Sequence, residues 1–81
     1  MSRKSVQSYK QGLAQAQNNL GVMYYNGTGV AQDSVQAYKW LNLGAASGNA
    51  DAEKNRDLFA SKMIPAQIAE AQRLASAWRE K

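Results

Sequence analysis

The sequence predicts an all-α protein, built as an α/α solenoid in which antiparallel helix hairpins pack side by side. Three observations predict this fold. Apolar residues recur at spacings of three and four, glycine-rich segments interrupt these runs, and a short motif reappears about 36 residues further along. The chain has 81 residues, enough for one small domain. No segment keeps the period-two alternation that would predict a β-strand.

The first full helix is predicted to begin near residue 13 and to end before two glycines. Gly27 and Gly29 flank Thr28, and glycine can take the positive φ that ends a helix and turns the chain. A phosphate-binding loop would need a preceding strand and a following lysine, and the sequence has neither here. The predicted inner face of this helix consists of Leu13, Ala16, Leu20, Met23 and Tyr24.

The second helix is predicted to begin at Ser34, because Asp33 before it is a favourable N-cap. Gly48 and Asn49 close this helix. Its predicted inner positions are Val35, Tyr38, Leu41 and Ala45, with Ala37, Trp40 and Gly44 beside them.

Two further helices are predicted on either side of Pro65, which is excluded from a helix interior but fits a first turn. The third begins near Ala50, and its early acidic residues Asp51 and Glu53 complement the helix dipole. Its predicted inner positions are Ala52, Asn55, Phe59 and Met63, with Leu58 at the edge. The predicted inner positions of the fourth are Ile68, Ala71, Ala75 and Trp78.

The chain also repeats itself. Residues 12–16 reappear in altered form at residues 48–52, and Asn19 is in step with Asn55. A period of this size with two helices per unit predicts stacked hairpins. We therefore expect one domain over 1–81, with a partial helix at 5–12, one full repeat at 13–48, and a half repeat with a capping helix at 49–81.

Composition argues against an enzyme. The chain has neither cysteine nor histidine, which excludes disulfides, thiolate nucleophiles, imidazole bases and nearly all zinc sites. We expect no catalytic residue, cofactor or metal. No apolar run approaches the ~18 residues of a membrane span, and no signal-peptide pattern is present, so we expect no membrane insertion.

The net charge of +4 leaves a second function class open. A basic helical module could bind nucleic acid or another acidic ligand through Lys10, Lys39, Lys54 and Arg56. These residues are scattered rather than clustered, which makes a solvated surface the simpler interpretation and nucleic acid a poor candidate partner.

The segment from Ala14 to Ala52 resembles a Sel-one-like repeat, a relative of the tetratricopeptide repeat. The resemblance rests on Ala14, Ala16, Leu20, Gly21, Tyr24, Gly27, Gly29, Val30, Asp33, Ala37, Trp40, Ala45 and Gly48. The segment after residue 55 resembles the capping helix pair of bacterial arrays. Gly44 departs from the usual alanine, and Ile64 departs from the usual threonine before Pro65. The resemblance implies an adaptor that binds other proteins, in the bacterial cytoplasm or periplasm.

A partner-binding groove is predicted on the other face of the first helix and on the third helix. In solenoids the first helix of each repeat lines the concave surface. The groove residues are Gln15, Asn18, Val22 and Tyr25, followed one repeat later by Lys54, Leu58 and Ser61. Exposed apolar positions among them would form a contact patch. The alternative, equally open, is that Val22, Tyr25 and Leu58 only pack between hairpins.

The aromatic residues are assigned to the core rather than to a ligand, because Trp40, Trp78, Tyr24 and Tyr38 recur at helical spacings. The N-terminal edge is expected to be incompletely covered. A short helix carrying Val6 and Tyr9 cannot shield the whole flank of the first hairpin. These two residues are therefore predicted contacts with a second copy, a preceding repeat or a partner protein.

Overall fold

The computed structural model describes the backbone of residues 3–79 and the side chains of residues 12–78. Four α-helices account for nearly all of this part: α1 (Arg3–Asn26), α2 (Ser34–Ala46), α3 (Ala50–Ala60) and α4 (Pro65–Arg79). The described residues contain no strand. The prediction of an all-α fold is confirmed.

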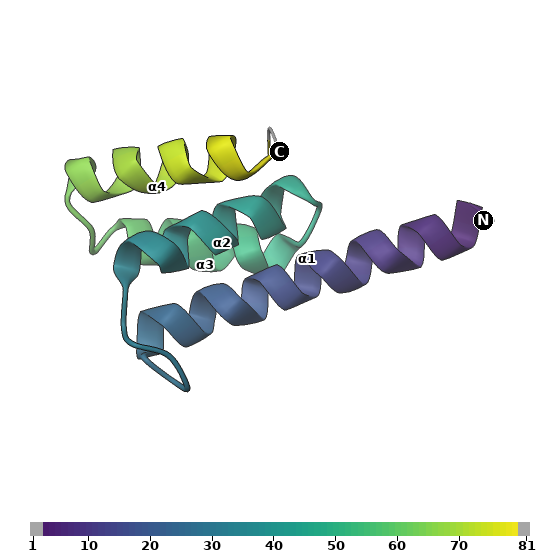
Figure 1. The fold of residues 1–81 in the computed structure, drawn as a ribbon, viewed down its shortest axis with the longest axis horizontal. Helices are drawn as coiled ribbons and strands as arrows, with labels where there is room; N and C mark the ends of the chain where they lie inside the picture. Colours follow the sequence, from purple (N-terminus) through teal and green to yellow (C-terminus); the bar gives the residue numbers. More distant parts are fainter. Residues whose placement is uncertain (1–2, 80–81) are drawn as a thin grey trace.

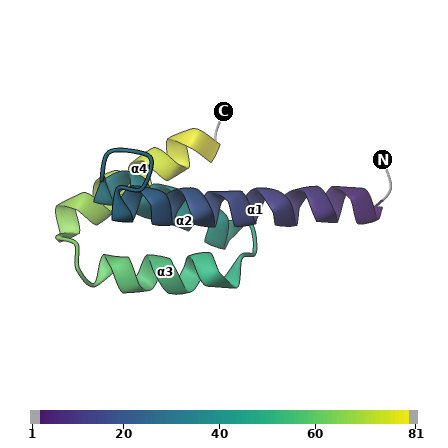
Figure 2. The same cartoon turned by 90° about the horizontal axis from the view of Figure 1, so that it is seen from below.

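Successive helices run antiparallel, and α2 contacts each of the other three (Figure 1). α1 also contacts α3, so the two odd-numbered helices form a second pair. The N-terminal end of α1 runs out past the ends of the other helices in both views (Figure 1, Figure 2). The result is an elongated molecule of 43 × 26 × 20 Å.

Each predicted turn forms as expected, through local hydrogen bonds. Gly27 has φ 71°, and the N–H of Thr28 donates to the carbonyl of Met23 at 3.0 Å, which ends α1. Asp33 then accepts a hydrogen bond from the N–H of Gln36 at 3.1 Å and caps α2. Asn49 caps α3 in the same way, by accepting from the N–H of Ala52 at 2.8 Å.

The start of α4 shows how the departure at Ile64 is compensated. Isoleucine cannot accept a capping hydrogen bond, but its own N–H donates to the side-chain oxygen of Gln67 at 3.1 Å. This contact is one half of a capping box, in which a glutamine in the first turn reaches back to the N-cap. Pro65 then begins the helix, as predicted.

The core lies between α2, α3 and α1. Leu41, Ala52 and Phe59 are buried together, and Val22, Tyr25 and Ala45 pack against them. α1 approaches α2 closely at Gly21, where an added Cβ would lie 2.6 Å from Cγ of Leu41. Gly44 is also tightly enclosed, because its added Cβ would lie 3.0 Å from that of Ala52. Both glycines therefore serve close helix packing.

The expected break at Gly12 is wrong. Residues 5–12 were predicted to be a partial helix that precedes the first full one, but α1 continues from Arg3 to Asn26 without interruption. A glycine inside a helix costs only about 1 kcal/mol relative to alanine, and Gly12 has no positive φ to turn the chain. Residues 5–12 thus belong to α1 and do not form a separate element.

The predicted inner face of α1 is also wrong. Leu13 and Met23 are 38% and 36% exposed, Ala16 is exposed, and Leu20 and Tyr24 are half-buried. The residues that face the rest of the molecule are instead Ala14, Gln17, Asn18 and Gly21, all of them buried. Gly21 lets α1 approach α2 closely, while the amides of Gln17 and Asn18 accept hydrogen bonds from Ser47 and Asn55, so this buried face is less apolar than the exposed one.

The other helices follow their predicted faces with one exception. Tyr38, Leu41, Phe59, Ala71 and Ala75 are buried as expected. Trp78, predicted to be a core residue, is 43% exposed in the last turns of α4. It packs edge-on against Trp40 of α2, with ring centroids 5.6 Å apart, and leaves its other side uncovered.

Candidate protein-binding groove

Six of the predicted groove residues lie on α1 and α3, which contact each other, and the seventh, Ser61, is the C-cap of α3. Four of the seven are exposed: Gln15, Lys54, Leu58 and Ser61. Asn18 is buried, and Val22 and Tyr25 are half-buried. The predicted set therefore divides into an exposed part and a part that joins the helices.

Asn18 is not available to a partner, which corrects its assignment to the groove. Its side chain is only 6% exposed, and its Oδ1 accepts a hydrogen bond from Nδ2 of Asn55 at 3.0 Å. A buried amide is stable only where its polar atoms are paired, and this contact provides the partner. The pair links α1 to α3, one residue out of step with the internal repeat, which relates Asn19 rather than Asn18 to Asn55.

Tyr25 and Val22 support the packing alternative. The ring of Tyr25 stacks on that of Phe59, with centroids 3.7 Å apart and an interplanar angle of 7°. Val22 packs against the cluster around Leu41. Both side chains thus contribute to the core, and only their outer edges remain accessible.

The exposed amides at one end of the helix pair form a chain of hydrogen bonds. Nε2 of Gln15 donates to Oδ1 of Asn19 at 3.0 Å, and Nδ2 of Asn49 donates to Oε1 of Gln15 at 3.2 Å. Asn19 and Asn49 were not predicted to be part of this surface. The signal for Asn19 was the internal repeat, which places it in step with Asn55, whereas the repeat places Asn49 in step with Leu13 and gave no such signal.

On α3 the exposed groove residues follow one helical face. Lys54 and Leu58 are four residues apart, and Leu58 follows the α1-facing Asn55 by three. Leu58 is 54% exposed, so a leucine side chain lies largely open beside the α1–α3 contact. The hydroxyl of Ser61 donates to the carbonyl of Leu58 at 2.6 Å, so this hydroxyl already has a hydrogen-bond acceptor within the chain.

The basic residues named for the alternative function lie in different surroundings. Lys39 lies over the ring of Trp40, with Nζ 4.2 Å from its centroid, and burial lowers the pKa of this amine. Arg56 donates to Asn42 at 3.3 Å and to Asp57 at 3.2 Å. Lys54 is exposed, and the side chain of Lys10 lies outside the described part. Two of the three described basic groups therefore already have intramolecular contacts.

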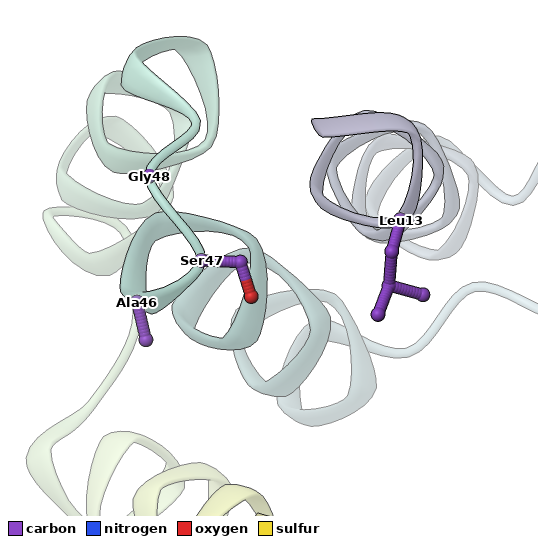
Figure 3. A pocket seen from close by; sticks show the side chains of 4 residues that line it. All are labelled: Leu13, Ala46, Ser47 and Gly48. Carbon is purple, nitrogen blue, oxygen red and sulfur yellow. The ribbon is translucent and has the colours of Figure 1, made fainter. Parts of the chain in front are cut away.

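A hollow of about 580 Å³ lies between α1 and the end of α2, lined by Leu13, Ala46, Ser47 and Gly48 (Figure 3). The sequence reasoning did not anticipate it, because Leu13 was assigned to the core. Leu13 on α1 and Ser47 at the end of α2 lie on opposite sides of this space (Figure 3). The lining residues include no titratable side chain, so the hollow offers no acid or base.

The described residues contain no group of three acidic, histidine or cysteine side chains that could hold a metal ion. No helix within the described range is both long and apolar enough to cross a membrane. Val6 and Tyr9, the predicted edge contacts, lie on α1, but their side chains are outside the described residues.

Comparison with known families identifies the central part of the chain. Residues 14–49 match the model of the Sel1 repeat, the family that the motif resembles. The match begins at Ala14 within α1 and ends at Asn49, the N-cap of α3, so it covers α1 from Ala14 onward, the following loop and the whole of α2. The comparison with curated proteins found no match.

Proposed function

Because residues 14–49 match the Sel1 repeat, we propose that the chain is a protein-binding adaptor. It engages its partner through the surface of α1 and α3. Sel1 repeats form non-catalytic helical scaffolds and generally mediate protein–protein interaction. The finer assignment, to this surface and these residues, is ours.

The observation that carries the proposal is the exposure of Leu58. A leucine that is 54% exposed adds nothing to the core, yet it lies beside the contact between two helices. Lys54 lies one turn away, and Gln15 and Asn19 offer amides from α1. An apolar centre with a polar rim is the usual composition of a protein contact surface.

The chemistry of these side chains suggests what the partner presents. Leu58 requires an apolar side chain, and the ammonium group of Lys54 would pair with a carboxylate nearby. The amide chain around Gln15 can exchange its internal hydrogen bonds for bonds to a peptide backbone. We therefore propose a partner segment in which an apolar residue is flanked by an acidic one.

The test compares two exposed apolar positions. The partner is first captured from a lysate with the immobilised chain and identified by mass spectrometry, and its Kd is then measured. Leu58→Asp should weaken this binding at least tenfold, because the carboxylate removes the apolar contact and faces the partner's acidic group. Ile64→Asp is the matched control: Ile64 is 62% exposed, lies outside the groove, and occupies an N-cap where aspartate is favourable.

Equal binding by both variants would contradict the groove assignment. The salt dependence of binding separates the alternative function. Binding to nucleic acid falls steeply with salt because phosphate contacts release counterions, whereas an apolar groove contact changes little. A steep loss between low and physiological salt would support the acidic-ligand alternative in place of the protein-binding groove.

A further inference from the structure

The apolar face of α1 that carries Leu13 and Met23 is covered only in part by the rest of the described chain. We define the outer strip as Leu13, Ala16, Leu20 and Met23. Leu13 and Met23 are 38% and 36% exposed, Ala16 is exposed, and Leu20 is half-buried. A different face of α1, centred on Ala14 and Gly21, packs against the other helices. α1 therefore has a second apolar seam, which the described part of the chain leaves partly exposed.

The spacing of the outer strip is that of a coiled coil. Its residues are separated by three, four and three positions, the alternation of a and d sites in a heptad repeat. In the sequence the same alternation continues backwards through Tyr9 and Val6. The register thus covers three consecutive a/d pairs on one uninterrupted helix. A helix that only covers a globular core has a broader apolar stripe.

α1 is long enough to pair with another helix along this strip. α1 has 24 residues, about 36 Å at 1.5 Å per residue, and its N-terminal end extends beyond the other helices (Figure 2). A helix of similar length and the same heptad register would match the strip along its whole length. The chain itself supplies such a helix, which is the α1 of a second copy.

The charges of α1 select the orientation of that pair. Its only charged residues are Arg3, Lys4 and Lys10, all basic and all in its N-terminal half. A parallel pair would bring these like charges together, whereas an antiparallel pair separates them by most of the helix length. Antiparallel helices also align their dipoles favourably. One register pairs all six positions, with Leu13 opposite Ala16, Tyr9 opposite Leu20, and Val6 opposite Met23.

We propose that this chain forms a two-fold symmetric dimer through the outer strip, with α1 packed antiparallel against α1 of the second copy. This surface is distinct from the groove between α1 and α3. A dimer would present two such grooves, related by the two-fold axis.

Analytical ultracentrifugation tests the association. At micromolar concentration the chain should sediment with about twice the monomer mass of 8.9 kDa. Ala16→Glu should shift it to monomer with unchanged helical circular dichroism, because it buries a charge at the centre of the pair while glutamate favours helix. Gln15→Glu is the control on the neighbouring position of α1, is exposed, and should remain dimeric. A wild-type monomer, or a dimer that survives Ala16→Glu, would overturn the proposal.

Disulfide trapping tests the orientation without relying on a disruptive variant. The chain has no cysteine, so single replacements are unambiguous. In an antiparallel pair, Leu13→Cys and Ala16→Cys mixed together should oxidise mainly to the 13–16 heterodimer. A parallel pair would instead yield 13–13 and 16–16 homodimers, and their predominance would refute the antiparallel arrangement. Mass spectrometry distinguishes these products.

Discussion

Gly29 shows how strongly a single backbone position constrains this hairpin. It has φ 76°, a conformation that is costly for a β-branched residue. The neighbouring Thr28 is exposed, and its backbone rather than its side chain ends α1. The loop between α1 and α2 therefore depends on glycine at position 29 and tolerates change at position 28.

We accordingly expect Gly29→Val to lower the free energy of unfolding by about 1–3 kcal/mol, whereas Thr28→Ala should change it by less than about 0.5 kcal/mol. Thermal melting followed by circular dichroism measures both. If Gly29→Val melts at the same temperature as the wild-type chain, the positive φ is not required, and the assignment of this turn fails.

At the scale of helices, Trp40 joins α2 to α4. Its ring meets that of Trp78 at an interplanar angle of 70° and also lies beneath the ammonium group of Lys39. Its indole nitrogen is buried without a hydrogen-bond partner among the described residues. The side chain thus contributes through packing, and α4 is attached largely through this contact and through Ala71 and Ala75, which are fully buried.

Truncating Trp40 to alanine should cost toward the lower end of ~3–5 kcal/mol, because the residue is half-buried. For a small domain that is a large share of the total stability, so Trp40→Ala should melt near room temperature. Trp78→Ala should cost distinctly less, since that residue is 43% exposed. Urea unfolding of the two variants compares these losses. A stable Trp40→Ala variant that had lost only partner binding would show that the indole meets a ligand.

At the scale of the whole molecule, dimerisation would couple stability to concentration. Folding would then be linked to association by mass action, and the dimer would become more stable as the chain is concentrated. Over a hundredfold increase in concentration, Tm should rise by roughly 5–10 °C for a domain of this size.

The same melts performed on Ala16→Glu should show no dependence on concentration. This comparison separates association through the outer strip from non-specific effects of concentration, which would act on both proteins. A wild-type Tm that does not change with concentration would contradict a dimer linked to folding.

Local signals in the sequence were sufficient for the loops between the helices, although not for the start of α1, where a break at Gly12 was expected. Asp33 and Asn49 cap helices with their own side chains, Pro65 begins one, and Gly27 and Gly29 adopt the φ that the turn demands. Each of these effects acts within a few residues, so it can be predicted without knowing what packs against what. The same is true of the repeat motif, which the family match at residues 14–49 confirms.

The choice of face on α1 was decided only by the tertiary structure. Periodicity identifies two faces on this helix, and the more apolar one, with Leu13 and Met23, was expected inside. The buried face is the one that permits close approach: Gly21 leaves no space beside Leu41, and Asn18 finds a partner in Asn55. The groove residues differ from the prediction for the same reason. Asn18, Val22 and Tyr25 face inward, whereas Leu58 and Lys54 are exposed. Hydrophobicity ranks each face separately, but packing depends on the distance between two backbones and on the pairing of amides across them, which no single helix specifies.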